Sequence, residues 1–400
     1  MKTLLSFLLA VPVLVAAEAP ALRFRAQVID PAIQIGYGLA IADVDGDGQA
    51  DVLLADQKQI VWYRAPRWEK FVMAENLTPK DNVCIAARDL DGDGKCEVAV
   101  GAEWNPGDTT GSGAIFLLDA PADRTQRWTP RRLPHDPTTH RMHWLRGADR
   151  TFSLAVLPLH GRGNKNNAGE GVRLLGYEWP WRESSRPVPL WSDLPPLHAT
   201  HNFDLVGGGG GRGGASEETL LVATKEGVRA VEAAANRMTP LTVTTMGAGE
   251  VRRGALPGGG RFIATIEPMH GTDLAVYRAP ATPGTGGADW TPSRTVLFDK
   301  LVQGHGLATA DLAGTGSDQI VVGWRGNNRP GDSIGIAVYG ATDATGEKWT
   351  RLALVDDKAM AVEDLKIADL NGDGRPDIIA AGRATKNVII YWNETEKAKK

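Results

Sequence analysis

The feature that most constrains this chain is a structural unit that returns seven times along its 400 residues. Each unit predicts an inner strand, a second strand formed by a nearly continuous apolar run, and a third strand. Runs of Val, Ile, Leu and Ala such as Asp51–Ala55 and Asp377–Ala381 indicate strands that are packed on both faces. A repeat of this kind predicts a stacked or ring-shaped all-β architecture.

The outer strands indicate how the repeat closes. Six can be recognised; several open on tryptophan, and those at 188–194 and 238–245 are weak. The seventh is missing after Trp392, whereas a strand-like segment, Leu22–Ile29, is left over at the N-terminus. Joining the two would hide the edges of an open array. We therefore predict an all-β, seven-bladed β-propeller of four-stranded blades over residues 18–393, with the last blade closed by the N-terminal strand.

The two ends of the chain and its charge bear on location and partners. Lys2, the apolar run Leu4–Val15 and Ala16–Ala17 predict a signal peptide over residues 1–17, and hence a secreted or periplasmic protein. No other segment approaches 18 apolar residues, so no membrane span is expected. A net charge of −4 shows no basic bias toward nucleic acid. Residues 394–400 form a charged tail.

Cys84 and Cys96 are the only cysteines, and an oxidising compartment would permit a disulfide between them. Both fall in one predicted hairpin. If Arg88 and Glu97 flank its turn, Cys84 lies about four residues from the position opposite Cys96, which is too far for a disulfide. Two unpaired, mostly buried thiols are expected.

Three of the turns after inner strands are acidic loops in which oxygen-bearing residues alternate with glycines. This pattern suits a hard cation with six to eight oxygen ligands, so we expect about three structural Ca²⁺ sites. The alternative is a turn that binds nothing. The predicted side-chain ligands are Asp43, Asp45, Asp47 and Asp51; Asp89, Asp91, Asp93 and Glu97; and Asp369, Asn371, Asp373 and Asp377. A fourth loop at Asp311 keeps the frame and has lost most ligands.

The loop motif D-x-D/N-G-D-G-x-x-D/E, placed between the first two strands of each unit, resembles the FG-GAP/VCBS repeat family. This family includes the integrin α-subunit propeller and many secreted bacterial proteins. The resemblance covers nearly the whole mature chain and implies a propeller. It does not select a function, because members include adhesion modules and enzymes.

The histidines gather on one face of the predicted propeller. Residues just before inner strands, and just after second strands, converge on one opening of the central channel. The candidate catalytic residues placed there are His140, His143, His160, His198, His201, His270 and His305, whereas His135 lies in an outer loop. Histidine is both a proton shuttle near neutral pH and a common metal ligand.

Other side chains at this opening suggest a ligand. A Zn²⁺, Mn²⁺ or Mg²⁺ site could be built across blades from His140, His198, Glu250 and His305. Aromatic and arginine side chains offer stacking faces and charged donors to a small carbohydrate. The candidate substrate-binding residues are Tyr37, Trp104, Trp144, Arg252, Trp324 and Arg325, whereas Trp68, Trp128, Trp290 and Trp349 are expected to pack between blades.

A narrower resemblance concerns the histidine segments. The segments Thr139–Trp144, Pro158–Asn164, His198–Asn202 and Glu267–Thr272 resemble the propeller part of the aldos-2-ulose dehydratase family, which eliminates water from keto-sugars such as 1,5-anhydrofructose. That family carries further cupin domains for a following isomerisation. The sequence given ends at Lys400, so elimination alone is expected.

Three functions remain open at this point. The first is a carbon–oxygen lyase in which a metal or cationic group polarises a ketone while histidines transfer protons. The second is a non-catalytic propeller that binds glycan or protein at the same opening. The third is cleavage of a longer glycan, such as a 3-keto-glycoside. The histidine count favours chemistry, and the lack of a separate catalytic signature keeps the binding function open.

Overall fold

The computed structural model describes residues 21–147, 149–192, 194–207, 218–242, 244, 246–279 and 293–396. Within these ranges every regular element is a β-strand, and no helix is present that is long and apolar enough to cross a membrane. The predicted signal peptide, most of the glycine run Gly207–Gly214, Trp290 and the end of the charged tail lie outside the described residues. The predicted all-β class is confirmed.

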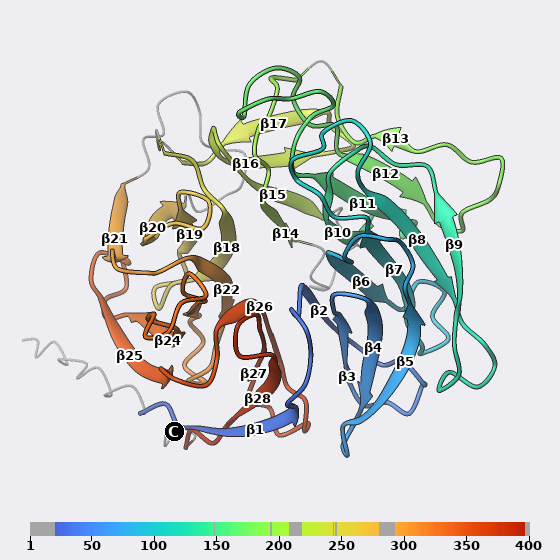
Figure 1. Ribbon diagram of the computed structural model, residues 1–400. Helices are drawn as coiled ribbons and strands as arrows, with labels where there is room; N and C mark the ends of the chain where they lie inside the picture. Colours follow the sequence, from blue (N-terminus) through green and yellow to red (C-terminus); the bar gives the residue numbers. More distant parts are fainter. Residues whose placement is uncertain are drawn as a thin grey trace, which may run out of the picture.

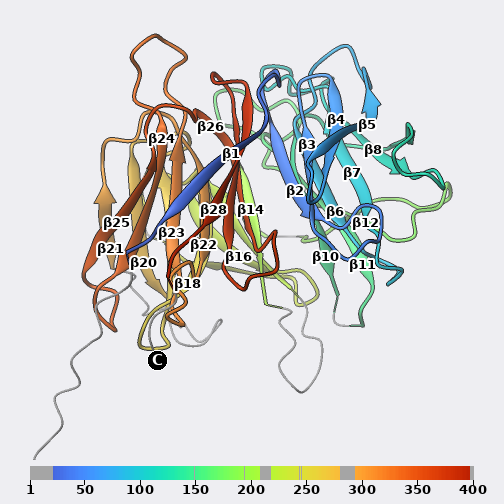
Figure 2. The same ribbon diagram turned by 90° about the horizontal axis from the view of Figure 1, so that it is seen from below.

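The strands form seven antiparallel sheets arranged in a ring around a central axis, which we call the channel (Figures 1 and 2). Blade 1 contains β2 (Gly38–Ala42), β3 (Asp51–Ala55), β4 (Gln59–Arg64) and β5 (Glu69–Glu75). Blade 2 contains β6 (Cys84–Arg88), β7 (Glu97–Ala102), β8 (Ala114–Asp119) and β9 (Thr129–Leu133). Blade 3 contains β10 (Thr139–Arg146), β11 (Phe152–Pro158), β12 (Leu175–Glu178) and β13 (Val188–Pro189). Blade 4 contains β14 (Asn202–Val206), β15 (Thr219–Thr224), β16 (Gly227–Glu232) and β17 (Arg237–Pro240).

The remaining blades complete the ring. Blade 5 contains β18 (Glu250–Ala255), β19 (Arg261–Glu267), β20 (Asp273–Ala279) and β21 (Arg294–Phe298). Blade 6 contains β22 (Gly304–Ala310), β23 (Gln319–Trp324), β24 (Gly335–Ala341) and β25 (Trp349–Asp356). Blade 7 contains β26 (Val362–Ala368), β27 (Asp377–Gly382), β28 (Asn387–Asn393) and β1 (Phe24–Asp30). The predicted seven-bladed propeller is confirmed.

The two ends of the chain close the ring as predicted. β1 pairs antiparallel with β28, with Phe24 opposite Asn393, and lies along the outside of blade 7 (Figure 2). The indole N–H of Trp392 donates to Gln27 Oε1 at 2.8 Å. This pairing gives the last sheet its fourth strand and covers the outer edge of β28.

The hydrophobic core lies between neighbouring blades. The apolar second and third strands are almost fully buried in most sheets, which explains why they lack polar alternation, whereas β16 of blade 4 is only half buried. Trp68 packs on Trp392 at a centroid distance of 6.1 Å, and Trp128 is 3% exposed between blades 1 and 2. Full burial of a large apolar side chain stabilises a fold by about 1.5–3 kcal/mol. These tryptophans therefore hold blades together, as expected.

The two cysteines are free and buried, as expected. Arg88 pairs with Glu97 across the hairpin, and Cys84 pairs with Gly101. Cys84 therefore packs between blades 2 and 3, whereas Cys96 packs between blades 1 and 2.

Two boundary predictions require correction. The weak outer strands predicted at 188–194 and 238–245 shorten to β13 and β17, each ending at a proline, which cannot donate a ladder hydrogen bond. The inner strand of blade 3 begins at Thr139 rather than at Met142, so His140 and His143 belong to one strand.

Candidate functional site

The polar residues of the channel gather at two opposite faces. Inner strands such as β2 start at the upper face in Figure 2 and run away from it. We call this face, which Figure 1 shows from the front, the mouth, and the opposite face, which carries the turns between first and second strands, the rim. The loops before first strands and after second strands meet at the mouth, as predicted.

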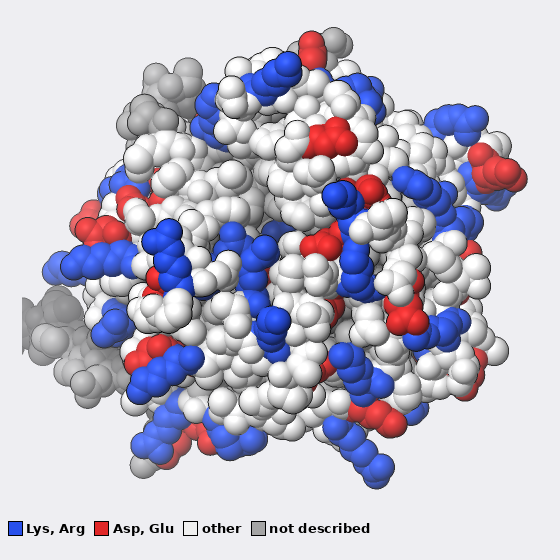
Figure 3. Space-filling view, viewed as in Figure 1, with Lys and Arg blue, Asp and Glu red and all other residues white. Residues whose placement is uncertain are grey.

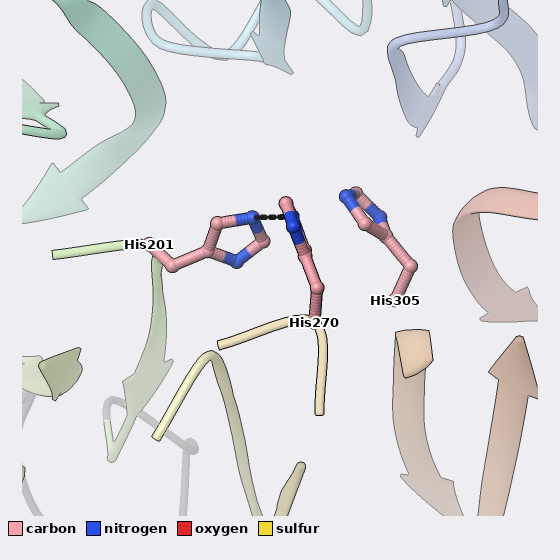
Figure 4. Close-up of side chains that lie close together, drawn as sticks. All are labelled: His201, His270 and His305. Atoms are coloured by element: carbon pink, nitrogen blue, oxygen red, sulfur yellow. Dashed lines mark hydrogen bonds between the residues drawn. The ribbon is translucent and has the colours of Figure 1, made fainter. Parts of the chain in front are cut away.

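Three histidines from three blades meet at the mouth. His201 precedes β14, His270 lies in the β19–β20 loop and His305 lies at the start of β22. Their ring nitrogens lie within 4.8 Å of one another, and the Nε2 atoms of His201 and His270 are 2.9 Å apart (Figure 4). The rings of His270 and His305 stack at a centroid distance of 4.9 Å. We call these three residues the triad.

Main-chain carbonyls fix the tautomers of two triad members. His201 Nδ1 lies 3.0 Å from the carbonyl oxygen of Gly249, and His305 Nδ1 lies 2.5 Å from that of Glu363. A carbonyl only accepts, so both Nδ1 atoms carry the proton. The Nε2 atoms of neutral His201 and His305 then carry lone pairs, and that of His201 faces His270 Nε2.

A fourth imidazole, His140, lies beside the triad. Its ring is 4.8 Å from that of His201 and stacks on Trp104, also at 4.8 Å. An Arg141 N–H lies 3.2 Å from His140 Nε2, which can therefore act as its acceptor. The Nδ1 atom, buried and without a well-formed hydrogen bond among the described residues, then carries the proton. We call His140 and the triad the four-histidine cluster.

The cluster is uncharged at neutral pH. Burial lowers the pKa values of His140, His201 and His305 well below the usual range, and the cation of Arg141 lowers each further. Burial also lowers the pKa of His270, with smaller contributions from His201 and Arg325. Neutral imidazoles keep the lone pairs that ligands or proton acceptors need.

Arginines surround the cluster and share one carboxylate. Glu363 accepts from Arg325 at 2.5 Å and from Arg383 at 2.9 Å, and Arg383 also lies over the ring of Tyr37. The Tyr37 hydroxyl donates to Asp81 at 3.0 Å. Figure 3 shows Lys and Arg side chains, interspersed with some Asp and Glu, around the middle of the mouth.

Two residues predicted for the opening lie on inner strands among the charged side chains of the channel. His143 packs its ring edge against Phe203, and burial, aided by Lys366 and Arg252, lowers its pKa to about 3. The guanidinium of Arg252 donates to its own neighbour, the Val251 carbonyl. Neither side chain belongs to the four-histidine cluster.

Two residues predicted as ligands of a transition metal, His198 and Glu250, are instead hydrogen-bonded to other groups of the protein. His198, expected to be a ligand, instead lies 2.7 Å from Glu226 and 3.0 Å from the Gly169 carbonyl, and His201 takes the inward position in blade 4. Glu250 accepts from the Asn202 amide and lies 3.1 Å from His201 Nδ1, so it supports a ring and is not grouped with the triad nitrogens. Burial raises the pKa of Glu250 to about 7.

Two tryptophans predicted to bind substrate belong to the core. Trp144 packs between blades 2 and 3 against Trp179, and Trp324 packs between blades 5 and 6 with its N–H donating to Ser333. Each lies at an alternate strand position that faces the neighbouring sheet.

Sequence reasoning missed Arg141 and Asp81. Arg141 stands between two histidines that drew attention, and strand alternation could have placed it in the channel. Asp81 lies before an inner strand, at the same kind of position as Tyr37.

The acidic loops at the rim have a common geometry. In each, the first aspartate accepts N–H groups from two glycines that have positive φ, as Asp43 does from Gly46 and Gly48. Such φ values favour glycine. Oxygens of Asp43, Asp45 and Asp51 lie within 4.8 Å of one another, as do those of Asp89, Asp91 and Glu97. The donor sets therefore fit Ca²⁺.

The last acidic residue of each loop is buried close to other carboxylates, and its pKa is raised. Burial, together with the charges of Asp45 and Asp47, raises the pKa of Asp51 to about 7. Burial likewise raises the pKa of Glu97 to about 7 and that of Asp377 to about 6. A bound cation would offset this repulsion.

Comparisons with known proteins agree with the fold. Residues 43–100 match the family model described as an FG-GAP-like repeat. Aldos-2-ulose dehydratase of Phanerodontia chrysosporium is 23% identical over 345 residues, which cover 79% of this chain and 37% of that protein. This chain therefore spans little more than a third of the length of that relative.

Solved structures match in fold. A chain of the mitotic checkpoint complex is 13% identical, with 99% of both chains covered and a TM-score of 0.55. The β-propeller domain of Swd1 from Myceliophteria thermophila is 9% identical, with 92% of this chain and 99% of that one covered and a TM-score of 0.51. At such identities these likenesses concern the propeller alone.

Proposed function

We propose that this chain is an exported, calcium-stabilised propeller that eliminates water or an alcohol from a keto-sugar at its mouth. The observation that carries the proposal is the four-histidine cluster, in which neutral imidazoles from blades 3 to 6 converge. The similarity to aldos-2-ulose dehydratase supports a carbohydrate substrate and a lyase reaction.

The triad is the proposed site for a transition-metal ion. His201 and His305 each donate Nδ1–H to a main-chain carbonyl and keep the lone pair on Nε2, which is the arrangement usual for metal-bound histidines. Imidazole ligands favour Zn²⁺ over Mn²⁺ and Mg²⁺. When bound, such an ion polarises a carbonyl group as a Lewis acid.

The remaining chemistry falls to side chains of the chain itself. Elimination removes a proton from the carbon beside the ketone and delivers one to the departing oxygen. In the second transfer the proton comes from the imidazolium that the base has become, and His140 Nδ1–H, held there by the Arg141 donor at Nε2, is suited to donate a hydrogen bond to the departing oxygen. The first needs a neutral base, and burial keeps the imidazoles in this state. Arg325 and Arg383 would stabilise the developing enolate.

The test is turnover of 1,5-anhydrofructose by the purified chain, followed by the ultraviolet absorbance of the enone that elimination produces. His140→Ala should lower kcat by about 10²–10⁴-fold, the usual contribution of general acid catalysis. Saturable binding of the sugar without enone formation in the native chain would favour the glycan-binding propeller instead.

A further inference from the structure

A cleft of about 380 Å³ lies outside the four-histidine cluster, in blade 3. It is lined by Asp136, Pro158, His160, Gly161, Arg162, Glu170, Gly171 and Arg173. Small-molecule sites usually begin at about 300 Å³, so this cleft has room for a small ligand. His160 therefore lines a cleft to which none of the four clustered histidines contributes.

The wall of this cleft is the β11–β12 loop, which neighbouring blades hold in place. On one side, Gly163 N–H donates to the Thr109 carbonyl and Arg162 donates to the Thr110 carbonyl. On the other, the Lys225 ammonium donates to the Asn167 carbonyl at 2.9 Å. Loops anchored at both ends keep their shape, so this cleft is pre-formed.

The floor of the cleft requires glycine. A Cβ atom on Gly161 would lie 2.1 Å from the carbonyl oxygen of Glu170 and 2.4 Å from that of Gly171. Contacts this short exclude any side chain at Gly161 unless the main chain moves. The two arms of the loop thus approach closely beneath the cleft.

The polar groups of the cleft are mixed and nearly balanced in charge. Asp136 is 9% exposed and accepts two hydrogen bonds from Arg173, at 2.6 and 2.8 Å, while Arg162 lies 3.5 Å away. His160 Nδ1 is buried and has no hydrogen-bond partner among the described residues. Burial, and to a smaller extent His198, lowers the pKa of His160, so its ring is neutral at pH 7. Such a mixture of donors and acceptors suits the hydroxyl groups of an uncharged sugar.

One residue connects the cleft with the four-histidine cluster. The Thr138 hydroxyl exchanges hydrogen bonds of 3.0 Å with both the N–H and the carbonyl of His160. Thr138 is fully buried and has a φ of 57°, which is rare for a β-branched residue. Since His140 follows two residues later, this strained position lies between the two sites.

We propose that the cleft binds the second sugar unit of a glycoside whose keto-sugar unit occupies the four-histidine cluster. This inference rests on the proposed function and narrows its substrate to a keto-glycoside of at least two units. A base takes the proton beside the ketone, the C–H electrons form the C=C bond, and the β-carbon–oxygen bond breaks. The departing oxygen receives a proton and leaves as a hydroxyl of the second sugar, with no change of oxidation state overall.

Binding tests the cleft without requiring turnover. Calorimetry on the full chain compares cellobiose, maltose and laminaribiose with methyl glucoside, none of which carries a ketone. At least one disaccharide should bind about tenfold more tightly than methyl glucoside, which equals about 1.4 kcal/mol. His160→Ala and Arg173→Ala should each remove most of this preference, whereas Arg351→Ala, an exposed arginine on blade 6, should leave it unchanged.

The outcomes separate the cleft from the reaction. If both cleft variants lose the disaccharide preference, the cleft is a sugar-binding site. If the native chain also turns over no keto-sugar, that result stands while the proposed function is wrong. The assignment of a second sugar site to the cleft is wrong if the native chain binds disaccharides no more tightly than methyl glucoside. It is also wrong if the variants weaken the binding of both ligands equally. Tighter binding of a glucuronate-containing disaccharide than of its neutral counterpart overturns the assignment to an uncharged sugar.

Discussion

The rim and the mouth lie at opposite ends of the same strands and are built in opposite ways. A rim loop is made within nine residues of one hairpin, as when Asp89 accepts the N–H groups of Gly92 and Gly94. The triad joins His201, His270 and His305, which are 69 and 35 residues apart in sequence. The rim therefore depends on local geometry, whereas the mouth exists only when the ring closes.

The donor atoms differ in the same sense. The rim offers crowded carboxylates in partial contact with solvent, and the mouth offers neutral, buried imidazoles. Oxygen donors suit Ca²⁺ and nitrogen donors suit transition metals. One fold thus separates a candidate structural cation site from a candidate reactive site by a strand length.

The largest expected effect concerns the mouth alone. His270→Ala removes one triad ring and should lower kcat on 1,5-anhydrofructose by about 10²-fold or more. His135→Ala, in an outer loop, is the matched control and should retain activity. Equal loss in both variants, or a fall in Tm that accompanies the loss in His270→Ala, would assign the triad a structural role.

Removal of calcium should act on the rim. At a free Ca²⁺ concentration of about 100 times Kd, each site contributes about 2.7 kcal/mol to the free energy of unfolding. A chelator should therefore lower Tm by many degrees, and calcium, but not magnesium, should restore it. Unchanged thermal unfolding after complete chelation would show that the acidic loops are ordinary turns.

The pH dependence of stability should reverse between calcium-loaded and chelated protein. Without calcium, the pKa of Asp51 lies at about 7 in the folded chain against an ordinary value of 3.8, mainly through burial. The contribution of Asp51 to the free energy of unfolding is complete below pH 3.8 and is lost as the pH rises to about 7. The loss is up to about 1.4 kcal/mol per pH unit. With calcium bound, protons compete with the ion, so acidification should destabilise. Urea unfolding at several pH values, with and without chelator, measures both slopes.

A glycine substitution distinguishes backbone geometry from ligand loss. Gly48 has a φ of 84°, and a Cβ atom added there would meet no other atom within 4 Å. Gly48→Ala therefore costs only the left-handed conformation, about 1–2 kcal/mol. Gly107→Ala, in a mouth loop at an ordinary φ, should change the unfolding free energy by less than about 0.5 kcal/mol. Urea unfolding of both variants measures the difference, and equal effects would contradict the geometric account of the rim.

The smallest expected effect concerns His198. Burial lowers the pKa of His198, but the Gly169 carbonyl and the Glu226 carboxylate outweigh it and hold the pKa above 6.5. The protonated ring ties the β11–β12 loop to blade 4, so this contribution is present below pH 6.5 and is lost as pH rises through the folded pKa. Over that pH interval, hydrogen exchange of residues 163–171 should become modestly faster. The free energy of opening of this loop should fall by roughly 0.2–1 kcal/mol. His198→Gln should remove the pH dependence.

The sequence predicted the parts that depend on local pattern. Asp43, Asp89 and Asp369 could be assigned to loops because their partners lie within eight positions. Repeat alignment also selected the four histidines that cluster at the mouth, together with His143, His160 and His198, which do not join them. The sequence could not predict which histidine of the pair His198 and His201 faces the cluster. That choice depends on the Gly249 carbonyl for His201 and on Glu226 for His198, and both partners come from distant strands.

The tryptophans show the same limit. Trp104 lies in a loop and stacks on His140 as a mouth residue should, whereas Trp144 and Trp324 lie in strands and turn into the core. Their fate depends on which face of each strand meets the neighbouring blade. Arg141 was missed because only the assembled channel reveals that it contacts His140.

The most direct test is elemental analysis of the purified chain and of two variants, one altered at each end. We expect calcium near three per chain and a transition metal near one in the native protein. His305→Ala should lose the transition metal and keep calcium, whereas Asp89→Asn should lose about one calcium and keep the transition metal. A native chain without a transition metal, or the same metal loss in both variants, would contradict the separation of a structural rim from a reactive mouth.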